Sequence, residues 1–194
     1  MTKKYLIPLF ILMVLAQWYI PAQMIVEQQR IIKRGTPYLF QLRPVDPTDY
    51  FRGKYITLSY REDKGIRVEK ERFNKGMPVY ACVSKDSLGY AVIDSVSLTI
   101  PDASIDYFET EVSRVYQNYK QRESEFSSMR IKFSFNRFYM EESKAPIAER
   151  KYNEVARDST INIAGKVYLY EGKTQLDNVL IDGVPIADWV MEEK

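Results

Sequence analysis

The chain has 194 residues, of which 45% are hydrophobic, so it has enough apolar side chains to form one packed domain. It contains no histidine and a single cysteine, Cys82, which excludes histidine-based catalytic triads, zinc sites rich in histidine or cysteine, and intrachain disulfides. The 28 basic residues nearly balance the 26 acidic ones, and we therefore expect no nucleic acid among the partners.

The N-terminus begins with a basic pair, Lys3 and Lys4, and residues 5–26 carry no charge. At about 1.5 Å per helical residue this segment can cross the roughly 30 Å hydrocarbon core of a bilayer. A cleaved signal sequence is an alternative, because the solid apolar run ends at Ala16. The best cleavage site, residues 20–22, has a bulky residue where a small one is needed, so we favour an uncleaved signal anchor over residues 1–26.

The same basic pair places the N-terminus in the cytoplasm by the positive-inside rule, and Trp18 and Tyr19 suit the opposite interface. The sequence therefore predicts a single-pass protein of the cytoplasmic membrane with an extracytoplasmic C-terminal domain, which is periplasmic if the cell is Gram-negative. A buried helix in a soluble protein is the remaining alternative.

Residues 27–36 form a polar connector that can continue the helix for two turns until Gly35 and Pro37 stop it. The rest, residues 37–194, is predicted to be mainly β, either all-β or a β-rich α+β domain, as one domain or as two interlocked lobes joined between Ser97 and Ser104. At least seven segments have the composition or alternation of strands: 37–44, 54–61, 77–84, 89–100, 129–140, 159–172 and 177–183.

Three segments give more detail. Alternation within residues 54–60 puts Ile56, Leu58 and Tyr60 on one, buried face of a strand. Residues 104–128 fit both helical and strand spacing and stay open between the two, with a charged exposed loop over residues 117–128. Residues 141–156 predict a short amphipathic helix.

The densest cluster of unusual residues is LRPVDPTDYFRGKYITLSY, residues 42–60. Its prolines hold the residues before them in extended conformations, and Asp49 is well placed to pair with Arg52. The stretch GKYITLSY resembles the motif of the GDYXXLXY family, with Lys54 in place of the name-giving acidic residue. Matching positions are Gly53, Tyr55, Leu58 and Tyr60, and weaker similarity follows in order at residues 78–84, 136–149 and 161–183.

The resemblance implies a bacterial protein with an N-terminal membrane segment and an extracytoplasmic β-rich domain, and it transfers no catalytic residue. We expect one structural network of motif residues and polar partners: Asp46, Asp49, Arg52, Gly53, Tyr55, Leu58, Tyr60, Arg137, Glu142 and Glu149. Glu142 and Glu149 are the best carboxylate pair for acid–base catalysis. Their predicted positions on either side of a short exposed helix favour a structural role for both instead. For Asp46 and Asp49, a salt-bridged turn is favoured over a cation site. We predict no catalytic residue, metal or cofactor.

Taken together, these features predict a non-enzymatic, membrane-anchored envelope protein whose β-rich domain binds or scaffolds another component. One alternative is an envelope hydrolase that uses carboxylates or a Ser/Lys pair. Another is an accessory subunit of a multi-span membrane protein, because Gln17, Pro21 and Gln23 within the span can face protein or lie at the membrane rim. Cys82, within an apolar strand, is predicted to be buried and inert.

Overall fold

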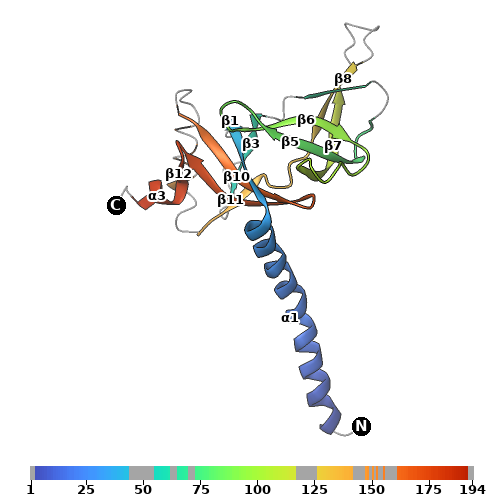
Figure 1. The fold of residues 1–194 in the computed structure, drawn as a ribbon. Coiled ribbons are helices and arrows are strands. Elements are labelled where there is room, and N and C mark those ends of the chain that lie inside the picture. Colours follow the sequence, from blue (N-terminus) through green and yellow to red (C-terminus); the bar gives the residue numbers. More distant parts are fainter. Residues whose placement is uncertain are drawn as a thin grey trace.

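The computed structural model consists of one long N-terminal helix and a β-rich domain that sits on its C-terminal end (Figure 1). The residues that it describes are 3–43, 55–61, 65–69, 73–116, 126–141, 147–148, 150, 152, 155 and 161–191. The predicted fold class, a mainly β domain preceded by a single apolar helix, is confirmed.

The helix α1 runs from Lys3 to Arg34 and is apolar on all sides along most of its length. Its large side chains, including Phe10 and Trp18, are exposed, which is stable in lipid but not in water. The segment Ile7–Arg34 is long and apolar enough to cross a membrane. Its polar Gln23 donates from Nε2 to the Tyr19 hydroxyl one turn earlier at 2.6 Å, so this amide has a partner within the helix.

The helix ends where the chain meets the β domain. The Gly35 amide donates to the Ile31 carbonyl at 2.8 Å. A Cβ at Gly35 would lie 2.5 Å from the Ile31 carbonyl oxygen and 2.7 Å from that of Leu169, so only glycine fits this approach. The connector from residue 27 to residue 34 is therefore helical, and the chain enters the first strand within two residues of the helix end.

The described residues of the β domain form two five-stranded sheets and one two-stranded sheet. The first sheet contains, in spatial order, β12 (Val184–Pro185), β11 (Lys173–Ile181), β10 (Ile163–Tyr170), β1 (Thr36–Arg43) and β3 (Ser59–Tyr60). The second contains β4 (Ile66–Glu69), β8 (Phe126–Ile131), β7 (Tyr107–Tyr116), β5 (Pro78–Lys85) and β6 (Ala91–Ser97). The small sheet pairs β2 (Tyr55–Thr57) with β9 (Arg137–Tyr139), and all these pairings are antiparallel. A short helix, α3 (Ile186–Met191), follows β12.

One continuous hydrophobic core joins the sheets. Phe40 of β1 and Phe108 of β7 are fully buried, and their rings meet edge to face with centroids 6.3 Å apart. Two parallel bridges also connect the sheets, Leu39 to Tyr90 and Phe108 to Gly172. Cys82 in β5 is buried, as predicted.

The structure corrects several strand predictions. Residues 54–61 do not form one strand, because β2 pairs with β9 whereas β3 pairs with β1. Residues 129–140 are likewise divided between β8 and β9 by a turn. The described parts of residues 104–128 contain the strands β7 and β8 rather than a helix, and residues 126–128 of the expected loop belong to β8. The rest of that loop, residues 117–125, lies outside the described residues. The strands β4 and β12 have no counterpart among the predicted segments, while the described positions between 147 and 155 are helical as expected.

Candidate functional site at the base of the domain

The surface where α1 meets the β domain is here called the base. It comprises the last two turns of α1, the turn between β10 and β11, and the β2–β9 sheet. The helix packs against β10 and β11, and β9 packs against β11. Residues 27–34 and 171–173 therefore lie together. The β2–β9 sheet is beside them, because the Ser134 hydroxyl before β9 and the Thr174 hydroxyl at the start of β11 are hydrogen-bonded at 3.1 Å.

An ion pair ties the β10–β11 turn to the helix. The Lys173 ammonium contacts the Glu27 carboxylate, and this hydrogen bond and opposite charge raise the pKa of Lys173 above its usual value. One turn further along the helix, Ile31 is 5% exposed, whereas its neighbour Ile32 is 36% exposed. The helix is thus attached to the domain by one charged contact and one buried apolar side chain.

Gly172 fixes the position of the same turn. Its φ of +79° is in the left-handed region, and its carbonyl accepts the Glu109 amide of β7 at 2.8 Å. A Cβ at this position would lie 2.9 Å from Cε2 of Tyr107 and 3.1 Å from Cγ of Glu109. Lys173 is therefore carried toward Glu27 by a turn that is bonded to the second sheet.

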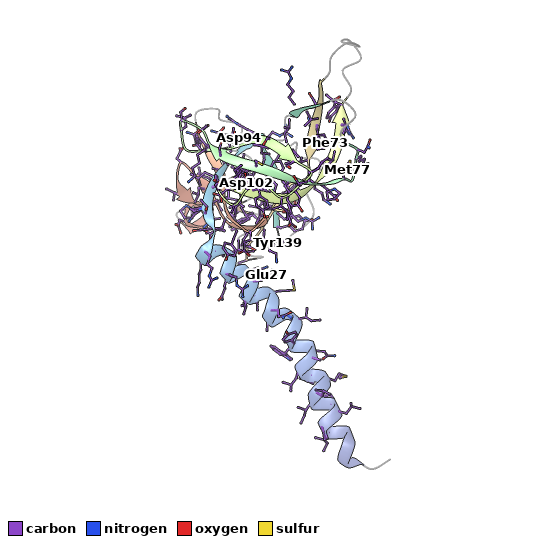
Figure 2. The ribbon with its side chains drawn as sticks, turned by 45° about the vertical axis from the view of Figure 1, so that its right-hand side comes forward. Glu27, Phe73, Met77, Asp94, Asp102 and Tyr139 are labelled. Carbon is purple, nitrogen blue, oxygen red and sulfur yellow. The ribbon has the colours of Figure 1, made fainter. Side chains whose placement is uncertain are left out.

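The solvent-facing side of the β2–β9 sheet is an aromatic and cationic surface, here called the platform. Tyr55 pairs directly with Tyr139, and their ring centroids are 5.4 Å apart. The Arg137 guanidinium lies 5.0 Å from the centroid of the Tyr55 ring, in cation–π geometry. Tyr139 is 63% exposed. Figure 2 shows Tyr139 on the underside of the domain, on the side from which α1 leaves.

The opposite side of the same segment is buried. Ile56, Leu58 and Tyr60 are each at most 3% exposed, which confirms the alternation read from the sequence. The Tyr60 hydroxyl donates to the Phe135 carbonyl at 2.8 Å, and burial raises the pKa of Tyr60 well above its usual value. The Tyr152 hydroxyl donates to the Arg43 carbonyl at 2.9 Å, and burial raises its pKa in the same way.

A hollow of about 450 Å³ lies along α1, from the span before the base to the first turn of the base, and all its lining residues belong to the helix. Its lining changes character along the helix axis, from aromatic and aliphatic side chains to charged ones. In chain order the lining residues are Tyr19, Ala22, Gln23, Val26, Glu27 and Arg30. The hollow is therefore mainly apolar toward the span, apart from the bonded Tyr19 and Gln23 side chains, and charged toward the domain.

Other pairs of ionisable groups lie elsewhere in the domain. The Tyr38 hydroxyl donates to Oδ2 of Asp106 at 2.8 Å, and burial together with this carboxylate raises the pKa of Tyr38. Lys166 contacts Asp177 at 3.3 Å and lies over the Tyr168 ring. Among the described residues no group of three cysteine, aspartate or glutamate side chains is arranged to hold a metal ion.

The family model of the GDYXXLXY proteins matches residues 17–179, which include the second half of α1 and most of the β domain. The chain belongs to the GDYXXLXY family. No curated protein and no solved structure matches the chain. The resemblance inferred from the motif is therefore confirmed over a much longer stretch than the motif itself.

Within this GDYXXLXY protein, the described motif residues have two different environments. Leu58 and Tyr60 belong to the core, and Tyr55 lies on the platform, where the structure brings it together with Arg137. The remaining candidate residues lie outside the described part of the chain: Asp46, Asp49, Arg52, Gly53, Glu142 and Glu149, together with Lys54.

Most residues of the base were not anticipated from the sequence, among them Tyr139, Glu27 and Lys173. A signal for Tyr139 exists, because Arg137 and Tyr139 alternate with the apolar Phe138 and therefore share one face of a strand. No such signal exists for Lys173, whose partner Glu27 is 146 positions away in sequence.

Proposed function

We propose that this GDYXXLXY protein is a single-pass protein of the cytoplasmic membrane that keeps α1 as an uncleaved anchor. Its β domain lies on the extracytoplasmic side and binds or scaffolds another envelope component through the base, without catalysing a reaction. The observation that carries the proposal is the junction itself. The apolar helix continues without a break into a domain that is tied to it by Glu27, Lys173 and Ile31.

The anchor is supported by the exposure of apolar side chains around α1, because lipid is the surroundings in which such a surface is stable. Retention of the segment is supported by the bulky Ile20 at the best cleavage site. Lys3 and Lys4 support a cytoplasmic N-terminus. Because basic residues also flank the other end of the span, at Arg30, Lys33 and Arg34, the orientation is tested directly with a reporter.

A binding role is supported by the composition of the platform. Tyrosine and arginine are enriched in protein recognition surfaces, since each offers a large contact area with a polar end. Tyr55, Arg137 and Tyr139 are preorganised by ring and cation–π contacts, so little side-chain freedom is lost when a partner binds.

The orientation is tested with a cysteine reporter at Asp94, an exposed position of β6 that Figure 2 places on the opposite side of the domain from Glu27. In a Cys82→Ala background, Asp94→Cys is labelled in intact spheroplasts by a maleimide that does not cross membranes. We expect full labelling before permeabilisation. Labelling that appears only after permeabilisation would place the domain in the cytoplasm and overturn the proposal.

The binding role is tested by placing a photo-crosslinking amino acid at Tyr139 and, as the control, at Asp94. Irradiation of cells is expected to give a discrete adduct from position 139 and none from position 94. Equal patterns of adducts from the two positions would contradict a binding surface at the base.

A further inference from the structure

The depth of the base relative to the membrane follows from the length of the apolar run. Between Lys4 and Glu27 the helix has 22 uncharged residues. They span about 33 Å, close to the roughly 30 Å hydrocarbon core. As the first charged residue after Lys4, Glu27 is therefore placed at the boundary between hydrocarbon and headgroups, and Trp18 and Tyr19 then lie within the span rather than at the interface expected from the sequence. Because Lys173 contacts Glu27, the β10–β11 turn lies at the same depth, in the headgroup layer.

The base also has the chemistry of a headgroup surface. Basic side chains outnumber acidic ones at the base, which contains Arg30, Lys33, Arg34, Arg137 and Lys173 but only two glutamates, Glu27 and Glu171. Glu109 of β7 lies close enough to act on the charge of Lys173. A guanidinium presents a planar fork of donors that fits phosphate oxygens. Tyrosine is enriched at membrane interfaces, where its ring contacts acyl chains and its hydroxyl reaches the headgroups.

The hollow beside α1 has a matching polarity. Tyr19, Ala22, Gln23 and Val26 line the part that lies at hydrocarbon depth, where the Gln23 amide is bonded to the Tyr19 hydroxyl, and Glu27 and Arg30 line the part at headgroup depth. An amphiphile with an apolar chain and a polar head that Arg30 can bind matches this order, whereas a soluble anion would leave the apolar side chains of the hollow in contact with water.

We propose that the base binds anionic phospholipids of the outer leaflet, with Arg30 in the hollow and Arg137 on the platform holding headgroup phosphates. The Tyr139 ring inserts among the neighbouring headgroups. This inference rests on the proposed function and names the component that the base binds. Lipid contact on one side of α1 fixes the orientation of the domain, so that the surface around Asp94 always points away from the membrane.

The test uses the full chain in nanodiscs, with a fluorophore attached to Thr57→Cys in a Cys82→Ala background. Thr57 pairs with Arg137 on the platform and is exposed, and it is not one of the proposed lipid contacts. Lipids that carry a nitroxide on the headgroup quench a nearby fluorophore. The same fluorophore at Asp94→Cys reports the opposite side of the domain.

We expect strong quenching at position 57 and little at position 94, and stronger quenching at position 57 in discs with phosphatidylglycerol than in discs of phosphatidylcholine alone. Each basic side chain near an anionic leaflet contributes about a fivefold preference for contact. The double variant Arg30→Gln, Arg137→Gln therefore lowers the contact equilibrium about 30-fold in phosphatidylglycerol discs. Replacement of both arginines by lysine is expected to retain most of the increase in quenching that phosphatidylglycerol causes at position 57.

The matched control is Lys75→Gln, which removes one positive charge from the turn between Phe73 and Met77, on the far side of the domain from α1 (Figure 2). Quenching in this variant is expected to equal that of the parent. Equal quenching at positions 57 and 94, or no effect of the double arginine variant, would overturn the lipid inference. A protein adduct rather than a lipid adduct from the crosslinker at Tyr139 would also overturn it.

The two proposals fail in different ways. A chain that incorporates into the discs and shows no quenching at position 57 contradicts the lipid inference alone. A chain that stays in solution without entering discs or detergent micelles contradicts the anchor itself, and with it the proposed function.

Discussion

Replacement of Tyr60 by phenylalanine tests the structural role of the family motif. Tyr60 is 2% exposed, and its hydroxyl donates to the Phe135 carbonyl at 2.8 Å. Tyr60→Phe keeps the ring and removes the donor, which leaves the buried carbonyl without this hydrogen bond. The free energy of unfolding is expected to fall by about 1–3 kcal/mol. For a domain of this size a loss of about 2 kcal/mol corresponds to a fall in Tm of about 4–8 °C.

The same assay separates the contribution of the Tyr60 ring to stability from that of its hydroxyl. The Tyr60 ring contacts Phe133 and Phe135 with centroids 5.0 and 5.1 Å apart. Tyr60→Leu also removes these contacts and is expected to cost about 3–5 kcal/mol. Urea unfolding of the full chain in detergent, followed by circular dichroism, measures both variants. Tyr139→Phe, at an exposed position, is the control and is expected to change stability by less than about 0.5 kcal/mol. If Tyr60→Phe is as stable as this control, Tyr60 has no such role.

Three further predictions concern the buried tyrosines, the β10–β11 turn and the helix junction. The pKa values of Tyr60 and Tyr152 in the folded protein are raised above the unfolded value of 10.0. What these two tyrosines contribute to the free energy of unfolding is therefore fully present below pH 10.0 and is lost as the pH rises beyond it. The loss of stability approaches about 1.4 kcal/mol per tyrosine per pH unit. Urea titrations at alkaline pH measure this slope, and Tyr60→Phe is expected to reduce it. A free energy of unfolding that does not change above pH 10.0 would argue against buried, protonated tyrosines. Gly172 and Gly183 both have positive φ, but a Cβ is crowded only at Gly172. Gly172→Ala is therefore expected to cost about 1–3 kcal/mol more than Gly183→Ala, and equal costs would rule out the crowding. At the junction, Ile31→Ala is expected to accelerate tryptic cleavage after Lys33 and Arg34 at least several-fold relative to Ile32→Ala, and equal rates would show that Ile31 does not hold the helix.

The sequence was most informative where burial repeats with a regular period. The alternation across Ile56, Leu58 and Tyr60 identified the buried face correctly even though the strand changes partner within it. The change of partner occurs at Leu58, whose amide donates to the Asn136 carbonyl at 2.8 Å. Because both sheets cover the same core, the hydrophobic pattern is identical on either side of the change and cannot reveal it.

The ambiguity of residues 104–128 has a specific physical cause. A bulge in β7 lies between Val112 and Arg114 and shifts the pairing register by one residue. Val115 therefore faces the core on the same side as Phe108 and Val112. The resulting intervals of four and three residues are those of a helix face, so a bulged strand imitates helical spacing in the sequence.

The site was accessible to sequence reasoning only in part. Tyr55 and Arg137 stood out because they belong to the motif and to a segment with weaker family similarity, and the structure places them in contact. The base as a whole depends on long-range contacts, such as Glu27 with Lys173 and Phe108 with Gly172. Periodicity within one element carries no information on such pairs, because they are determined by how the sheets pack.

The central claim, that α1 is a retained anchor, is tested most directly by the intact mass of the protein in the membrane fraction. Membranes are washed at alkaline pH to remove peripheral proteins, and the chain is then extracted in detergent and analysed by mass spectrometry. We expect a membrane-bound chain whose mass, 22.8 kDa for the 194 residues, includes residues 1–26. A chain that is released by the alkaline wash, or one that begins after Ala22, would contradict it.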